Sequence, residues 1–228
     1  MKRVLKIFLT ITFIVSALNA GEPTKEQLIS DMIKAYGGEK NIRQLNSYMQ
    51  VWDIETKTNG GKGVDNRRVD MPYFLRTELI YPDKTETRVL IKDYGTKDFG
   101  TRKIQAQGPM LDAMKLQLMR LFNPLVLRDN LKDIRLFIKK KYYLLSFKRA
   151  TITAEYFVSK KSFLVSKVIG RLKMGSRNMD FLTLYEDYRP VLGVMVNHKE
   201  VKYAGSVNTA VMRLKEMKFL KTPRRHRR

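Results

Sequence analysis

The side chains that usually carry catalysis are scarce in this chain. It contains no cysteine and only two histidines, His198 and His226, so it lacks the clustered ligands on which zinc sites depend. It has no phosphate-binding glycine loop, nucleophile elbow or HExxH helix. Glu186 and Asp187 are adjacent on an expected strand and point to opposite faces, which does not favour a two-carboxylate site. We therefore expect no metal, no cofactor and no enzyme, with a dispersed active site as the remaining enzymatic alternative.

Large, pliable apolar side chains are the more unusual feature. The chain has twelve methionines, and Met110, Met114 and Met119 fall, with Leu118, in one expected helix. Methionine fills irregular space and adapts to varied apolar ligands, so this helix could be a lid over an apolar cavity. The same residues serve equally well as ordinary core.

A strand near residues 47–57 shows the same ambiguity. Tyr48, Gln50, Trp52 and Ile54 alternate along it and share one face, which lines either a cavity or a closed core. The candidate cavity or lid residues are Trp52, Phe74, Leu79, Met110, Met114, Leu118 and Met119.

Helical patterns occur twice. Thr24 to Gln27 has the form of a capping box, and apolar residues then recur at helical spacing, which predicts a helix over 25–36 that ends at Gly37-Gly38. A short helical turn follows at 39–45. Pro109 opens the second helix, over 108–122, and Asn123-Pro124 is expected to end it.

Short runs of β-branched and aromatic residues fill the rest of the chain. They predict antiparallel strands near 47–57, 63–70, 73–81, 86–92, 97–105, 133–139, 141–149, 151–159, 162–173, 178–187, 191–203 and 208–219, with a turn at 94–96. So long a sheet rarely stays open without curling. The fold class is therefore α+β but mainly β, a single long curved antiparallel sheet with helices over its concave side.

The first twenty residues have the pattern of a targeting signal. A basic start at Lys2, Arg3 and Lys6, an apolar run and a small-residue exit are typical of a secretory signal peptide over 1–20, cleaved near Ala17 or Ala20. The apolar run is shorter than the ~20 residues of a membrane-spanning helix, although a retained anchor is the alternative. The residue that follows Ala20 is Gly21, so there is no cysteine at this position to which the lipid of a lipoprotein could be attached. We expect an exported, soluble, monomeric domain over 21–220 and a basic disordered tail over 221–228.

The positive charge lies mainly in the second half. Residues 133–228 hold 23 Lys and Arg against 7 Asp and Glu, within a chain of net charge +23. Such a field attracts anionic surfaces. Behind a signal peptide the expected partner is an anionic membrane surface or an acidic protein rather than nucleic acid. The run from Lys139 to Tyr143 mixes cations with aromatics but is more typical of a strand edge protected by lysines.

Several short motifs resemble one family. Ala35-Tyr36-Gly37-Gly38, the segment 42–48, the proline segment 71–76 and the glycine segment 93–99 are similar to those of periplasmic lipoprotein carriers of the Lol system and outer-membrane lipoprotein-sorting proteins. The resemblance implies an incomplete, half-open β-barrel that is closed by helices and carries lipoprotein acyl chains, or another lipid, in an apolar cavity.

One position departs from that family. Lol carriers place an arginine, which helps to latch the lid, immediately before the proline, and here that residue is Met71. Arg67 or Arg68 are the candidates to replace it. The residues thus leave three classes open: a carrier of acyl chains, an interaction or sensor module with a solidly packed sheet and a basic docking face, and a periplasmic enzyme with a dispersed site.

Overall fold

The described part of the protein is residues 21–175 and 177–220 of the computed structural model. The expected signal peptide over 1–20 and the basic tail over 221–228 lie outside the described residues. Within the described ranges, no helix has the length and apolar character needed to cross a bilayer.

The N-terminal helix forms as its sequence predicts. Helix α2 (Lys25–Ala35) begins at Thr24, whose hydroxyl accepts a hydrogen bond from the Gln27 N–H at 3.2 Å. It ends at Gly37 and Gly38, which have φ angles of 116° and 81°. A Cβ on Gly37 would lie 2.0 Å from the carbonyl oxygen of Gly193, so the close approach of two chain segments also requires glycine there. Helix α3 (Glu39–Ile42) and the 3-10 helix η2 (Arg43–Asn46) follow.

The described strands form one antiparallel sheet with 13 members, which confirms the mainly β prediction. They are β1 (Ser47–Thr56), β2 (Lys62–Asp70), β3 (Phe74–Tyr81), β4 (Lys84–Ile91), β5 (Tyr94–Asp98), β6 (Lys103–Ala106), β7 (Ile134–Ile138), β8 (Tyr142–Arg149), β9 (Ile152–Ser159), β10 (Val165–Met174), β11 (Arg177–Val191), β12 (Val194–Ala204) and β13 (Val207–Phe219). Their order is β6-β5-β4-β3-β2-β1-β13-β12-β11-β10-β9-β8-β7.

The sheet has two arms, β1–β6 and β7–β13, which meet where the first strand pairs with the last. Tyr48 lies opposite Phe219 and Thr56 opposite Ala210 along this junction. Because all other neighbours are consecutive in sequence, each arm is a meander of hairpins, and only the β1–β13 pairing brings the two ends of the domain together.

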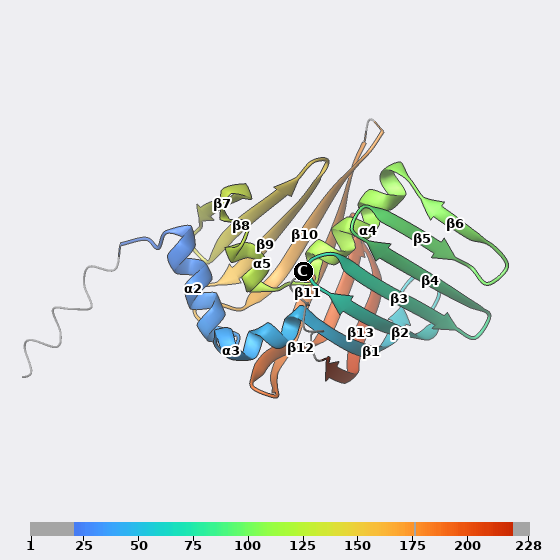
Figure 1. Ribbon diagram of the computed structural model, residues 1–228, viewed down its shortest axis with the longest axis horizontal. Coiled ribbons are helices and arrows are strands. Elements are labelled where there is room, and N and C mark those ends of the chain that lie inside the picture. Colours follow the sequence, from blue (N-terminus) through green and yellow to red (C-terminus); the bar gives the residue numbers. More distant parts are fainter. Residues whose placement is uncertain (1–20, 176, 221–228) are drawn as a thin grey trace, which may run out of the picture.

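Helix α4 (Gly108–Arg120) lies between the arms, as Figure 1 shows. It contacts β9 and β10 on one arm and β4 and β5 on the other. In a flat sheet β4 and β10 would be about 34 Å apart at ~4.8 Å per strand, whereas a helix of 13 residues is only about 20 Å long. The sheet must therefore curve around α4, and the prediction that helices lie on its concave side is confirmed.

Glycines on both arms allow this contact. A Cβ on Gly95 of β5 would come within 3.0 Å of the Leu111 and Met114 side chains, and one on Gly170 of β10 would lie 2.8 Å from Cδ of Arg120. The backbone of each arm can approach the helix because these positions carry no side chain.

Two details of the sequence prediction were wrong. The strand expected at 97–105 is two strands, β5 and β6, because the chain turns at 99–102, where Gly100 has a φ of 83°. The expected turn at 94–96 lies inside β5; the reversal falls at Lys92 and Asp93 instead. The prediction also omitted helix α5 (Pro124–Arg128) and the 3-10 helix η3 (Leu131–Asp133). Asn123 caps α5 by accepting the Leu125 N–H at 2.9 Å, so Asn123-Pro124 starts a helix as well as ending one.

Candidate functional site

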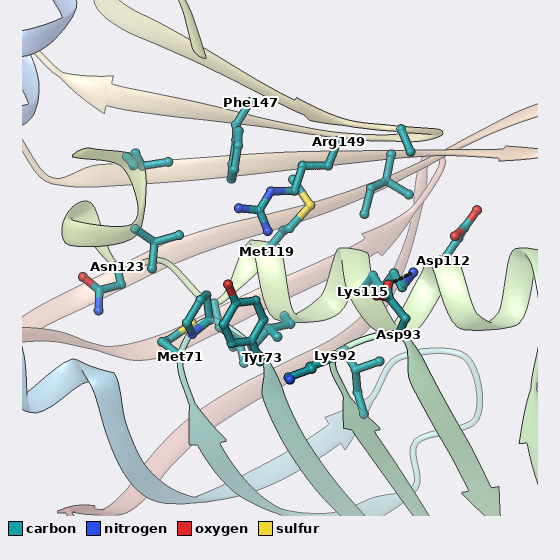
Figure 2. Close-up of a pocket in the computed structure, with 18 of the residues that line it drawn as sticks. Met71, Tyr73, Lys92, Asp93, Asp112, Lys115, Met119, Asn123, Phe147 and Arg149 are labelled. Atoms are coloured by element: carbon teal, nitrogen blue, oxygen red, sulfur yellow. Dashed lines mark ion pairs between the residues drawn. The ribbon is translucent and has the colours of Figure 1, made fainter. Parts of the chain in front are cut away.

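A pocket of about 520 Å³ lies between α4 and the strand ends of the two arms. Figure 2 shows residues of both arms around it, with Met71 and Tyr73 on one side, Phe147 and Arg149 on the other and α4 between them. Its lining residues are Met71, Pro72, Tyr73, Leu90, Lys92, Asp93, Asp112, Lys115, Leu118, Met119, Leu121, Asn123, Val126, Leu127, Phe147, Arg149, Ala150, Thr151, Ile152 and Tyr156.

The floor of this pocket is apolar. Leu118 and Met119 contribute from α4, Leu127 from α5, and Phe147 and Ile152 from the β8–β9 hairpin. Leu127, Phe147 and Ile152 are almost fully buried within the cores on which the pocket rests. Such a floor favours a ligand that presents hydrocarbon.

The rim of the pocket is polar and carries charges of both signs, three cations and two carboxylates. Lys115 of α4 pairs with Asp93 at 2.6 Å, and this lysine lowers the pKa of the Asp93 carboxyl. The Thr151 hydroxyl donates to Asp112 at 2.7 Å. Lys92 and Arg149 form no ion pair with any described residue, and the Arg149 guanidinium lies 4.9 Å from the centre of the Phe147 ring. A ligand with an apolar body and a polar or anionic end fits this distribution.

Two buried tyrosines fix the C-terminal end of α4 to the sheet. The Tyr156 hydroxyl donates to the carbonyl of Met119 at 2.6 Å, and that of Tyr185 donates to the carbonyl of Arg120. Burial raises the pKa of both phenols, so they remain protonated donors. In the first turns of α4, Gln107 provides no side-chain cap and Met110 is 40% exposed, but Asp112 accepts from Thr151 and Leu111 packs against the core of the β1–β6 arm. Contacts therefore hold α4 along its length beside the pocket.

Three of the residues proposed from the sequence line the pocket: Leu118 and Met119, predicted as cavity or lid, and Met71, predicted as latch position. Met114 is buried beside it in the core between α4 and the β1–β6 arm. Met110 lies on the exposed side of α4.

The other proposed apolar residues lie elsewhere. Trp52, in the middle of β1, is fully buried and packs with Leu79 in a core cluster outside the pocket lining. Its ring nitrogen donates to the Gln50 side chain at 3.0 Å. Phe74 is half-buried, with the Arg68 guanidinium 5.5 Å from its ring centre.

The two latch candidates have different environments. Arg67 is 1% exposed and binds Asp65 at 2.6 Å and Glu200 at 3.3 Å, so its partners are carboxylates of the sheet. Arg68 points to the exposed face and pairs with Asp70 at 3.3 Å.

The sequence prediction omitted the pocket residues of the β8–β9 hairpin and, next to Met71, Pro72 and Tyr73. Phe147 was indistinguishable from core by its alternation, and Arg149, Ala150 and Thr151 had no motif. The one available signal was the aromatic residue Tyr73 directly after a proline, beside the predicted latch position.

Among the residues that the structure describes, no three His, Cys, Asp or Glu side chains form a group that could hold a metal ion.

Comparison with solved structures identifies the fold. The chain is similar to a LolA superfamily protein of Nitrosomonas europaea, with a TM-score of 0.59 and 12% identity over 88% of this chain and 96% of that one. It is also similar to a candidate outer membrane lipoprotein-sorting protein domain of Vibrio parahaemolyticus, with a TM-score of 0.53 and 8% identity over 85% of this chain and 91% of that one. A DUF1329 family protein of Desulfovibrio piger matches with a TM-score of 0.50 and 9% identity over 84% and 91%.

No protein-family profile and no curated protein sequence matches the chain. The likeness is thus one of fold: this protein has the fold seen in the LolA superfamily structure, and the resemblance expected from the sequence is confirmed at that level.

Proposed function

We propose that this protein is a periplasmic, non-enzymatic carrier that shields acyl chains of a lipoprotein or another lipid in the 520 Å³ pocket. The observation that carries the proposal is the pocket itself, with its apolar floor beside α4 and with Lys92 and Arg149, which pair with no carboxylate of the described residues, at its rim. Its volume falls within the range of about 300–1,000 Å³ typical of small-molecule sites. The shared fold supports a role in outer-membrane lipoprotein sorting.

Hydrocarbon burial alone can supply the affinity. Each methylene transferred from water contributes about 0.8 kcal/mol, so ten of them contribute roughly 8 kcal/mol before the cost of ordering the chain. Lys92 and Arg149 at the rim are placed to meet a polar or anionic end of the ligand. No reacting group is needed.

Filling the pocket tests this assignment. Val126 lines the pocket and is only partly buried, so Val126→Trp should occupy the ligand volume. The matched control is Val207→Trp, at a valine that is 55% exposed at the start of β13. With an apolar fluorescent probe, we expect the wild type and Val207→Trp to bind and Val126→Trp to lose about tenfold or more in affinity. Equal binding by both variants would contradict the assignment.

We also propose that one end of the β7–β13 arm docks on anionic membranes. The β7–β8 and β9–β10 turns lie at the same end of the sheet and carry Lys139, Lys140, Lys141, Lys160 and Lys161. Lys160 lies 4.9 Å from the ring centre of Tyr143, and none of the five forms an ion pair with another described residue. Each lysine near an anionic surface is worth about 1 kcal/mol.

Vesicle pull-down at two salt concentrations checks this surface. Changing Lys139, Lys140 and Lys141 to Gln should weaken binding to anionic vesicles. The matched triple change of the exposed Lys62, Lys84 and Lys103 on the other arm should weaken it less. Binding that ignores both lipid charge and salt would refute the membrane partner. If the apolar probe also failed to bind, the interaction-module alternative, with an acidic protein as partner, would be favoured.

A further inference from the structure

A second cavity, of about 210 Å³, lies on the sheet side of α4. It is separate from the acyl-chain pocket, although Leu121 at the end of α4 lines both. Its lining comes from α4 and from the facing strands of both arms and includes Arg67, Arg88, Arg120, Thr183, Glu200 and Lys202.

Positive charge is in excess around this cavity. Four cationic side chains line it, Arg67, Arg88, Arg120 and Lys202, against one carboxylate, Glu200. Arg67 is neutralised by Asp65 and Glu200, and Lys202 shares Glu200 at 3.2 Å. Arg88 is paired with Glu86, which also binds Lys97 at 3.1 Å.

Arg120 is the cation without a counter-charge. No carboxylate of the described residues lies within 4.0 Å of its guanidinium, which donates to the Thr183 hydroxyl. Its Nε is buried and has no hydrogen-bond partner among the described residues. The guanidinium also lies 5.9 Å from the centre of the Phe181 ring. Desolvation, which no paired carboxylate offsets, lowers the pKa of Arg120.

The helix dipole alone does not compensate the charge of an arginine at this position. A cation in the last turn of a helix gains only a modest stabilisation from the helix dipole, whereas removing a charge from water without a partner carries a desolvation cost, and Arg120 is partly buried with its Nε fully covered. Lys202 is also partly buried, with its side chain 25% exposed, and desolvation together with repulsion from Arg67 and Arg120 lowers its pKa to about 8 despite Glu200. An anion between these groups would satisfy both.

We propose that this cavity is a binding site for a small oxyanion, such as a phosphate, sulfate or carboxylate group, held by Arg120 and Lys202 with Thr183 as a neutral donor. Charge-assisted hydrogen bonds to guanidinium and ammonium are the usual means of recognising such groups. The anion is either free in solution or the headgroup of an amphiphile. The site does not depend on the proposed acyl-chain function.

Titration calorimetry of the full chain with sulfate at constant ionic strength tests the site. We expect Arg120→Met to lower sulfate affinity about tenfold or more, the loss of one charge-assisted bond. Arg135→Met removes an exposed arginine from β7 and should leave the affinity unchanged. The charge of sulfate is constant between pH 7 and 9.5, so loss of the Lys202 proton should weaken wild-type binding over that interval.

Lys202→Met is the second variant, in case Arg120→Met does not fold. It should bind sulfate more weakly and lose the pH dependence above 7. Short-chain phosphatidic acid distinguishes the two sources: tighter binding than sulfate assigns the site to a headgroup, and weaker binding assigns it to a free oxyanion. The proposal is overturned if the wild type binds no sulfate. It is also overturned if the variant that folds binds sulfate as tightly as Arg135→Met does, because the net charge of +23 would then explain the binding.

Discussion

At the scale of single residues, the buried ion network in the centre of the sheet is the least expected feature. Arg67, Asp65 and Glu200 are each at most 3% exposed. They occupy buried strand positions at which apolar side chains would ordinarily form the core. Arg67 meets Glu200 through two nitrogens, both at 3.3 Å. Burial raises the pKa of Glu200, but Arg67 and Lys202 outweigh it and hold this pKa at about 2. Glu200 is therefore ionised in the folded protein.

Glu200→Gln should destabilise the protein at pH 7. Removing one partner of a buried pair costs about 3–5 kcal/mol, because the remaining charges lose their compensation. The folded pKa of Glu200 lies below its unfolded value, so its contribution is complete above about pH 4.5 and declines as the pH falls towards 2. Denaturant unfolding across this range should show the gap between wild type and variant narrowing in acid.

Glu216→Gln is the matched control, since Glu216 is exposed on β13 and forms no ion pair with a described residue. A pH-independent gap for Glu200→Gln, or one no larger than that of Glu216→Gln, would contradict the ionised network.

At the scale of elements, the junction between α2 and the β11–β12 hairpin depends on one glycine. The Met195 N–H donates to the carbonyl of Tyr36 at 3.1 Å, and Gly37 follows in a conformation that favours glycine. Gly37→Ala should lower the free energy of unfolding by roughly 2 kcal/mol or more, through backbone strain and the clash with Gly193.

Thermal unfolding checks this prediction against Gly38→Ala. Gly38 also has a positive φ, but a Cβ there meets nothing within 4 Å. The difference between the two variants isolates the close approach. Equal losses would show that only backbone strain acts at this junction.

Elements with a local signal were predictable and those set by distant contacts were not. The capping of α2 at Thr24 and its glycine stop, the proline start of α4 and most hairpins followed from neighbouring residues. Strand β5 was misplaced because Gly95, a turn residue by sequence, is needed in a strand to admit Leu111 and Met114 of α4. That requirement comes from an element later in the chain.

At the scale of the whole molecule, α4 divides the interior into two chemically different cavities. The sheet curves around the helix, with the apolar pocket beside α5 and the cationic cavity over the central strands. Alternation along a strand predicts which side chains share a face, and it placed Trp52 and Gln50 together correctly. Alternation does not show whether side chains of other elements fill the space over that face or leave a pocket there. Trp52 therefore lies in core while Met71, Leu118 and Met119 line the pocket.

The most direct test of the carrier is the chemistry of what it retains. The full chain, exported and purified from the periplasm of a bacterial host, would be extracted with organic solvent and the extract analysed by mass spectrometry. We predict acyl-chain lipid or acylated peptide in the extract of the wild type and much less in that of Val126→Trp. An extract without acyl chains, from a protein that also fails to bind the apolar probe, would contradict the carrier function.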